Sequence, residues 1–237
     1  KLREQVFPKD FAVLYRTNAQ SRSIEEALRK RNIPYKIYGG LSFYQRKEIK
    51  DILAYCRLTI NPNDEEALKR IINYPSRGIG NTTIQKLITT SNNLNISIWE
   101  LINNLNTFEH TINKGTCKKI QEFSSLISSY ISQLETKDAY FLAEHIAKSS
   151  GVFNDLYNDK SPEGVSRFEN IQELLNGLKD FCENNEENLL ANYMQDVALL
   201  TNQDNETKED YNKVTLMTVH AAKGLEFPYV FVVGLEQ

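Results

Sequence analysis

The stretch Val214–Val233, VTLMTVHAAKGLEFPYVFVV, decides the fold class of this 237-residue chain. Its two ends, Val214–Val219 and Tyr229–Val233, are short runs of β-branched, aliphatic and aromatic residues, which are typical of strands, and His220–Phe227 connects them. From about residue 45 to 210 the sequence carries no convincing strand pattern, so strand character returns abruptly here. The sequence therefore predicts a sheet and a separate helical block.

The N-terminal part of the sequence has strand character too. Phe11–Tyr15 is a short apolar run, Ala19–Arg31 has the periodicity of an amphipathic helix, and Tyr35–Tyr38 predicts a second strand before two glycines. The helix places three apolar residues on one face: Ile24, Ala27 and Leu28. Both ends of the chain thus predict parts of one α/β layer.

The middle of the sequence is helical. The helix predicted from Gln45 onward carries an apolar stripe of Ile49, Ile52, Leu53 and Cys56, and a second stripe of Leu68, Ile71 and Ile72 follows a turn at Asn61–Asp64. Further helices are predicted near residues 82–90, 97–105, 116–134, 138–149, 163–183 and 188–200. The simplest organisation is a helical domain inserted into a loop of an α/β domain, which gives a mixed but predominantly α fold.

The predicted strands are too few for a stable two-sided parallel sheet, so we expect the chain to be a piece of a longer protein. Thr201–Lys213, TNQDNETKEDYNK, is polar and charged and predicts an exposed, mobile linker before the returning strands. Together with Gly39 and Gly40, this linker is the expected hinge of the inserted domain.

The formal net charge of -3 hides an uneven distribution. Residues 1–90 carry 17 basic against 9 acidic residues, a net charge of +8, whereas residues 91–237 carry 11 against 22, a net charge of -11. A basic segment of this kind predicts an anionic partner that docks on it. The alternative is a set of solvated helices that simply differ in charge.

Several classes of protein and site are excluded by the sequence. No apolar run approaches the roughly 20 residues that a membrane helix needs, and the N-terminus lacks a signal-peptide core, which predicts a cytoplasmic protein. The scattered cysteines Cys56, Cys117 and Cys182 predict reduced, mostly buried thiols, and the three histidines have no partner at metal-ligand spacing. A P-loop and a GxGxxG motif are both missing, so we expect this chain alone to bind no nucleoside triphosphate well.

The segment Tyr74–Ile84, YPSRGIGNTTI, carries the clearest local signal for nucleic acid. Glycines at 78 and 80 let backbone N–H groups approach a phosphate closely, and the helix predicted next adds partial positive charge. Arg77 would supply a full charge, and Asn81–Thr83 would cap the helix or donate hydrogen bonds to phosphate oxygens. A plain helix-turn-helix corner is the alternative.

The helix predicted at 45–58 supports the same kind of surface. Lys50 and Arg57 are two helical turns apart and share a face with Lys47, opposite the apolar stripe. The alternative is an ordinary solvated face, partly neutralised by Glu48 and Asp51.

Polar loops follow the first strand and the returning strand. Arg16–Asn18 comes directly after Phe11–Tyr15, and Thr218–Phe227 begins where the returning strand ends. Because α/β proteins bind ligands at the carboxyl ends of their strands, these loops predict a site at one edge of the sheet.

Four strings of the sequence resemble, in order and spacing, the superfamily 1 DNA helicases of the UvrD/PcrA/Rep type. They are LYRTNAQSR (Leu14–Arg22), YGGLSFYQRKEIKDILAYCRL (Tyr38–Leu58), RGIG (Arg77–Gly80) and TLMTVHAAKGLEFPYVFVVGLE (Thr215–Glu236). The resemblance covers nearly the whole chain, and TVHAAKGLEF is highly specific. It implies that residues 1–38 and 212–237 belong to a RecA-like subdomain, 2A, and that residues 39–211 form the helical 2B subdomain inserted into it.

The resemblance also implies roles for individual residues. Contacts with single-stranded DNA fall on Arg16, Thr17, Asn18, Thr218 and His220. Contacts with ATP, completed by other subdomains, fall on Gly224 and Glu226. Contacts with the duplex ahead of the fork fall on Lys50, Arg57, Arg77, Gly78, Ile79, Gly80, Asn81, Thr82 and Thr83.

Such helicases use ATP and Mg²⁺ to move 3′ to 5′ on DNA in repair and replication. The Walker A lysine, the Walker B carboxylates and the arginine motifs are missing from this sequence, so the resemblance implies neither a catalytic residue, nor a metal site, nor ATPase activity in this chain alone. Alternatives are a helicase-nuclease subunit of the AddA/RecB kind, a closer Rep relative, and a regulatory module that docks repair or replication proteins on the acidic part.

Overall fold

The computed structural model of the chain describes residues 6–202 and 212–235, which form two compact units. The sheet unit comprises the described residues within Lys1–Ile49, Lys160–Gly177 and Asp196–Gln237. The helical unit comprises Lys50–Asp159 and Leu178–Gln195. The fold is mixed α and β, and mostly helical, as predicted. The subdomain boundaries at residues 38/39 and 211/212 stay a prediction, and most of the predicted linker lies outside the described residues.

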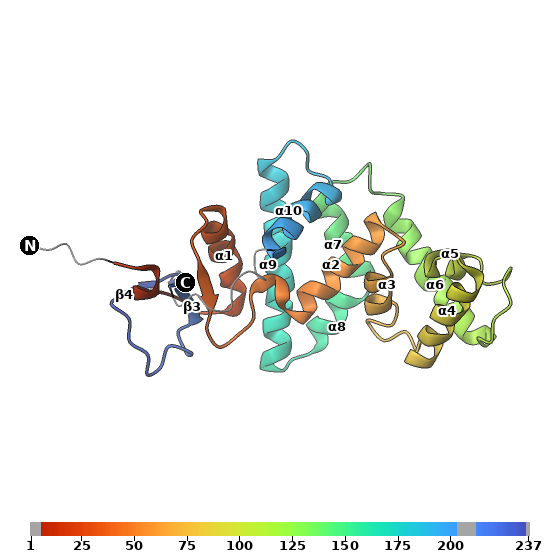
Figure 1. Cartoon of the computed structure of the whole chain (residues 1–237), viewed down its shortest axis with the longest axis horizontal. Coiled ribbons are helices and arrows are strands. Elements are labelled where there is room, and N and C mark those ends of the chain that lie inside the picture. The colour runs from red at the N-terminus through yellow and green to blue at the C-terminus, as the bar shows by residue number, and fades with distance from the viewer. Residues whose placement is uncertain (1–5, 203–211, 236–237) are drawn as a thin grey trace, which may run out of the picture. The chain divides into compact units, whose positions relative to one another are not determined.

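The elements of the chain are labelled in Figure 1. The strands are β1 (Phe11–Tyr15), β2 (Tyr35–Ile37), β3 (Val214–Thr218) and β4 (Tyr229–Val232). The α-helices are α1 (Ser21–Lys30), α2 (Lys47–Ile60), α3 (Glu65–Ile71), α4 (Asn81–Leu94), α5 (Ile98–Asn103), α6 (Lys114–Ile131), α7 (Ala139–Ser149), α8 (Val152–Asn158), α9 (Pro162–Asn184) and α10 (Leu190–Asn202). Short 3₁₀ helices occupy Pro8–Asp10, Asn18–Gln20 and Phe43–Gln45.

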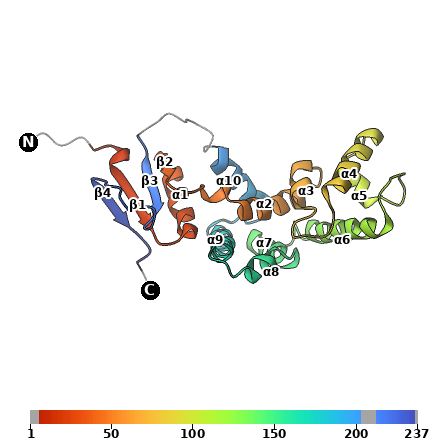
Figure 2. The ribbon, with the colours of Figure 1, turned by 90° about the horizontal axis from the view of Figure 1, so that it is seen from below.

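The sheet unit is built on four parallel strands in the order β2-β3-β1-β4. Figure 2 shows the strands side by side, with α1 next to them. Ile24 and Leu28 of α1 pack against a core that includes Tyr15 and Leu216, so the predicted apolar face does meet the sheet. The chain leaves and re-enters this sheet between β2 and β3, which confirms that both ends of the sequence build one α/β layer.

The opposite side of α1 is buried as well, although its residues are polar. Ser21, Arg22, Glu25 and Arg29 are all buried. A buried polar group costs free energy unless it has hydrogen-bond partners, so this side of α1 depends on contacts that the amphipathic pattern does not predict.

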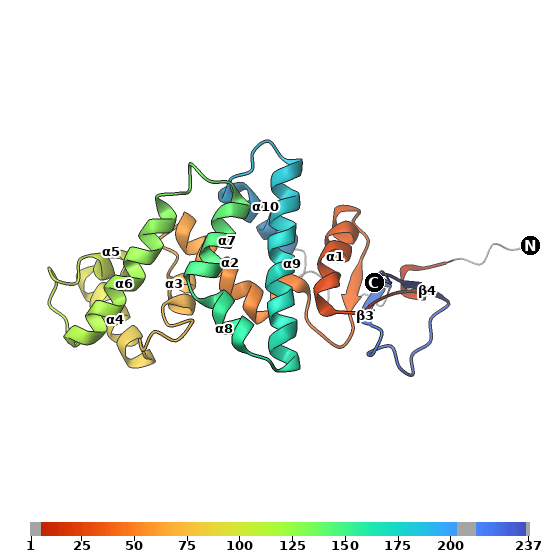
Figure 3. The same cartoon turned by 180° about the vertical axis from the view of Figure 1, so that it is seen from behind.

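The helical unit packs around the apolar stripe of α2, as predicted. Ile52, Leu53 and Cys56 are buried in it, and further buried side chains come from α3, α6 and α7: Leu68, Ile71, Ile120, Phe123, Ile127, Tyr130, Leu142 and Ile146. Figures 1 and 3, seen from opposite sides, both show α4 and α5 beside α6. Among residues 6–202 and 212–235, the helices are too short or too polar to cross a lipid bilayer.

Side-chain caps fix where several of these helices begin. Asp64, Ser97, Asn113 and Asp138 each accept a hydrogen bond from a backbone N–H in the first turn of the helix that follows. Such caps each stabilise a helix by about 1 kcal/mol. The predicted helices are confirmed to within a few residues, but α8 was not predicted.

Candidate nucleic-acid interface

Two polar loops leave the sheet at the same edge. Tyr15 and Thr218 are partners in register on the parallel strands β1 and β3, and the N–H of Val219 donates to the carbonyl oxygen of Tyr15 at 2.9 Å. The residues that follow, from Arg16 and from Val219 onward, therefore start side by side. The structure thus brings together the two loops that the sequence places at the carboxyl ends of strands.

The side chains predicted to contact a single strand are accessible in this arrangement. Arg16, Asn18 and His220 are exposed, while Thr17 and Thr218 are half-buried. The Thr218 hydroxyl oxygen accepts a hydrogen bond from the N–H of Ala221 at 3.3 Å, so its own proton is available to a ligand. A guanidinium, an imidazole and hydroxyl donors on two loops that start from adjacent strand ends suit a chain of phosphates and sugars.

Gln20 shapes the first of these loops, which the sequence analysis missed. Its Oε1 accepts hydrogen bonds from the N–H groups of Arg16 at 2.8 Å and Thr17 at 3.1 Å. Its amide also lies against Gly234, where an added Cβ would collide with it. The spacing of Thr17 and Gln20, three residues apart before a helix, is the sequence signal that could have found it.

Gly224 and Glu226, the residues predicted to face ATP, lie on the connection between β3 and β4. Both are exposed, and Gly224 has φ +84, a left-handed conformation that favours glycine. The part of the chain that the structure describes contains no group of three or more acidic, histidine or cysteine side chains that could hold a metal ion.

A second candidate site lies at the loop before α4, in the helical unit. Gly78 has φ +70, and Gly80 is the N-cap of α4, which therefore begins without a side-chain cap. The first N–H groups of a helix have no acceptor within the helix. Asn81 and Thr82, the first two residues of α4, are exposed. Thr83 is half-buried. Free N–H groups, hydroxyls and the positive end of the helix suit a phosphate group.

Arg77 faces into the protein rather than away from it. Its Nη1 donates to the carbonyl oxygens of Ile71 and Tyr74, and its Nη2 donates to the Tyr55 hydroxyl at 2.7 Å and the Ser150 carbonyl at 3.0 Å. Burial raises the pKa of Tyr55 to about 12, although Arg77 acts in the opposite direction. The geometry gives Arg77 a structural role, and its phosphate contact stays a prediction.

Ile79 has a structural role of the same kind. Its side chain is fully buried, and its N–H donates to Oδ1 of Asn73 at 3.0 Å. The same oxygen accepts the N–H of Arg77 at 2.9 Å, so Asn73 holds both sides of Gly78. The apolar residue between the glycines therefore anchors the loop.

Lys119 of α6 is a positive charge that the sequence analysis missed. A Cβ added at Gly78 would lie 2.5 Å from its Nζ, so the ammonium group sits directly over the loop. Lys119 is exposed. It adds to this loop a charge that Arg77, held internally, does not present.

The basic face predicted on α2 is only partly available. Lys50 is exposed, but Arg57 is half-buried and forms ion pairs with Asp64 at 2.9 Å and Glu66 at 3.5 Å. The acids predicted to neutralise this face act elsewhere: Glu48 accepts a hydrogen bond from Asn170, and Asp51 pairs with Arg70. The duplex contact of Arg57 stays a prediction.

Comparisons with known proteins point to one family. A family model described as the UvrD-like helicase C-terminal domain matches residues 1–237. The ATP-dependent DNA helicase PcrA of Staphylococcus aureus (strain NCTC 8325 / PS 47) is 40% identical over 231 residues, which cover 97% of this chain and 31% of that protein. PcrA of Staphylococcus epidermidis (strain ATCC 12228 / FDA PCI 1200) is 40% identical over 230 residues, which cover 96% and 31%. The chain therefore spans less than a third of the length of these curated relatives.

Proposed function

Since the chain belongs to the UvrD-like helicase C-terminal domain family, we propose that it is a DNA-holding part of an ATP-dependent 3′-to-5′ DNA helicase in repair or replication. The observation that carries the proposal is the register of Tyr15 and Thr218, which joins the two polar loops at one edge of a parallel sheet. In this proposal the strands belong to the RecA-like subdomain 2A, and residues 39–211 are the inserted subdomain 2B.

The loops at the strand edge hold single-stranded DNA. Arg16 supplies a charge to a phosphate, while Thr17, Asn18 and Thr218 donate hydrogen bonds to phosphate or sugar oxygens. His220 adds an aromatic ring on which a base can stack. These contacts are with the backbone and with the flat faces of bases, which all four bases share, so the site binds DNA with little preference for sequence.

The loop at Gly78 holds duplex DNA. The glycines allow a phosphate to approach the backbone, and the N–H groups of Asn81 and Thr82 and the hydroxyls of Thr82 and Thr83 donate to it. Lys119 and Lys50 supply charge, and Arg77 with Ile79 keeps the loop in shape. The energetic contribution of such phosphate contacts falls steeply as salt rises, because releasing counterions into a more concentrated solution gains less entropy.

ATP and Mg²⁺ are bound by the longer protein, with Gly224 and Glu226 contributing from this chain. A carboxylate such as Glu226 can accept hydrogen bonds from ribose hydroxyls, and the left-handed Gly224 leaves the approach open. Phosphoryl transfer needs a P-loop, metal-binding carboxylates and arginines together, and the sequence supplies none of these sets. We therefore propose that the 237-residue chain alone does not hydrolyse ATP.

A binding assay with three DNAs tests the proposal. The chain is titrated at low salt against fluorescent single-stranded DNA, blunt duplex and a duplex with a 3′ single-stranded tail. Because the proposal assigns one site to each kind of DNA, the tailed duplex should bind most tightly, and ATP should not be hydrolysed. If none of the three binds, the DNA-holding role is wrong, and docking of partner proteins on the acidic part becomes the better account.

A further inference from the structure

The backbone of the Arg16–Asn18 loop is held by two side chains. Gln20 accepts the N–H groups of Arg16 and Thr17, and Nη1 of Arg46 donates to the carbonyl oxygen of Asn18 at 2.9 Å. The exposed side chains of the loop are therefore presented on a backbone whose polar groups are already bound within the sheet unit.

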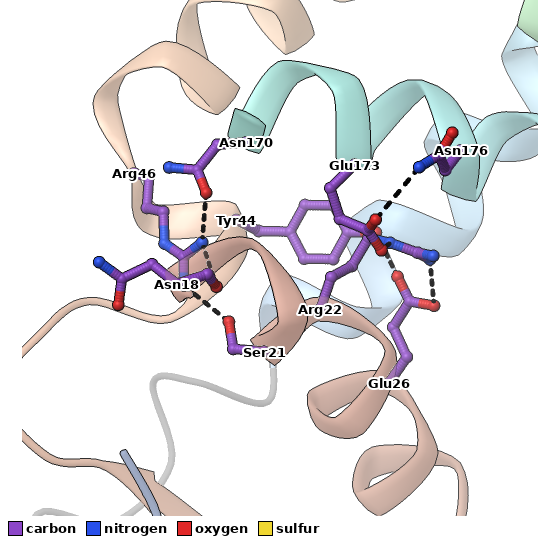
Figure 4. Close-up of polar contacts among 9 residues, drawn as sticks. All are labelled: Asn18, Ser21, Arg22, Glu26, Tyr44, Arg46, Asn170, Glu173 and Asn176. Carbon is purple, nitrogen blue, oxygen red and sulfur yellow. Dashed lines mark hydrogen bonds and ion pairs between the residues drawn. The ribbon is translucent and has the colours of Figure 1, made fainter. Parts of the chain in front are cut away.

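Arg46 is itself fixed from several sides. Its side chain is buried, its Nη2 donates to Oγ of Ser21 at 2.6 Å, and its Nη1 also donates to Oδ1 of Asn170 at 2.9 Å, as Figure 4 shows. Its guanidinium lies 5.1 Å from the centre of the Phe43 ring. A planar guanidinium with this many partners has a single orientation, so it places the Asn18 carbonyl accurately.

Asn170 completes the chain of contacts. It is only 3% exposed, and its Nδ2 donates to Oε1 of Glu48 at 2.6 Å while its Oδ1 accepts from Arg46. The amide is thus used at both ends, which fixes which way it points. Removing it would leave two buried charged groups with fewer partners, which costs more than the hydrogen bonds alone.

We propose that Arg46 and Asn170 are positioning residues for single-strand binding: through the Asn18 carbonyl they set the conformation of the Arg16–Asn18 loop. The proposal rests on the proposed function of that loop. It makes a residue in the middle of α9 control a DNA contact 152 positions earlier in the sequence, from Asn18 to Asn170.

A neighbouring cluster of side chains between α1 and α9 provides the control. Arg22 of α1 donates to Glu173 of α9 at 2.8 Å and pairs with Glu26 at 3.0 Å, and Asn176 contacts Glu173 at 3.3 Å (Figure 4). These contacts link side chains of α1 and α9 and do not involve the backbone of residues 16–18. Asn176→Ala, an exposed asparagine on the same helix, is therefore the matched control for Asn170→Ala.

The experiment measures amide hydrogen exchange of Arg16–Gln20 without DNA, single-strand affinity, and the midpoint of urea unfolding. Asn170→Ala should raise exchange of the loop amides about tenfold and weaken single-strand binding by a similar factor, since it loosens a buried hydrogen-bond network. Arg46→Lys should act likewise, because an ammonium cannot make the same set of hydrogen bonds. Asn176→Ala should change neither the exchange of the loop amides nor the single-strand affinity.

A double variant tests the network by rescue. In Glu48→Gln with Asn170→Asp, the new carboxylate accepts from Arg46 and the new amide donates to it, so the hydrogen bonds and the net charge are kept. Loop exchange and affinity should return toward the original values. If Asn170→Ala leaves loop exchange unchanged, or raises exchange equally throughout the chain, the positioning role is overturned. A third outcome is also possible: Asn170→Ala raises exchange of the loop amides, but the original chain binds no single-stranded DNA. That result would support the positioning role and overturn the proposed function.

Discussion

Tyr15 and Thr218 lie opposite each other on β1 and β3, and the carbonyl oxygen of Tyr15 accepts the N–H of the residue after Thr218 at 2.9 Å. These strands are separated by about 200 residues, most of them helical, yet their carboxyl ends coincide to the residue. The long helical stretch between the two strands therefore leaves their alignment intact, and the loops after β1 and β3 start from the same edge of the sheet.

Gly78→Ala should disturb the loop before α4. Its φ of +70 disfavours a side chain, and the new Cβ would lie 2.5 Å from Lys119 Nζ, so we expect a loss of about 1–2 kcal/mol in the free energy of unfolding. Gly80→Ala is the comparison: Gly80 has φ -75 and no atom within 4 Å of an added Cβ, so its loss should be smaller and come only from the poorer N-cap preference of alanine. Urea unfolding measures both. Equal losses in the two variants would contradict the account of Gly78.

Lys119→Ala should weaken binding of blunt duplex DNA about threefold to tenfold at low salt. It should also reduce the slope of log affinity against log salt concentration by about 1, the share of one phosphate contact. Lys118→Ala, which removes an exposed charge from the neighbouring position of α6, is the control. The measurement is duplex affinity over a series of salt concentrations. If both variants weaken binding equally, the effect comes from overall charge and not from the position of Lys119 over Gly78.

Arg77→Lys should destabilise the chain by about 2 kcal/mol, because a single ammonium group cannot satisfy the carbonyl oxygens and the Tyr55 hydroxyl that the guanidinium serves. Urea unfolding measures this loss, and duplex affinity is measured well below the unfolding midpoint. Should Arg77→Lys keep full stability and lose only duplex affinity, Arg77 would be a direct phosphate contact, as the sequence suggested.

Stability should fall at alkaline pH. Burial raises the pKa of Tyr55, of Cys56 and of Tyr130 to about 12 in the folded chain. In the unfolded chain such groups lose their protons at about pH 10 for tyrosine and about 8.5 for cysteine. Between these values and 12 the unfolded state binds fewer protons, so each group lowers stability by up to about 1.4 kcal/mol per pH unit as pH rises.

Urea midpoints between pH 8 and pH 11.5 check this prediction. Tyr130→Phe removes one of the three groups, so its midpoint should fall less steeply than that of the original chain. A midpoint that stays constant up to pH 11.5 would show that these side chains reach solvent in the folded state.

Much of the fold was predictable because it rests on short-range patterns. The apolar runs of Phe11–Tyr15 and Val214–Val219 predicted the strands, and the stripe beginning at Ile49 predicted α2. The helix α8 (Val152–Asn158) was missed because it buries only Val152 and Leu156, and two apolar positions do not make a recognisable stripe. The rule that ligands bind at carboxyl ends of parallel strands predicted a site where β1 and β3 end; the register of Tyr15 with Thr218 confirms that the two loops leave the same edge, and the site itself stays a prediction.

The polar contacts that shape the candidate sites were not predictable in the same way. Arg46 and Asn170 are 124 residues apart, and no periodicity links them. Arg57 was expected to face DNA because of its spacing from Lys50, but the acid that caps α3, Asp64, pairs with it. Such pairings depend on which helices meet in three dimensions, and the sequence pattern of one helix does not contain that information.

The salt dependence of single-strand binding tests the central claim most directly. The measurement is the slope of log affinity against log salt concentration for the original chain, for Arg16→Ala and for Lys36→Ala, which removes an exposed charge from β2 of the same unit. We predict that Arg16→Ala lowers affinity and reduces the slope by about one phosphate contact, whereas Lys36→Ala changes neither. Identical behaviour of all three chains would contradict a single-strand site at the edge where β1 and β3 end.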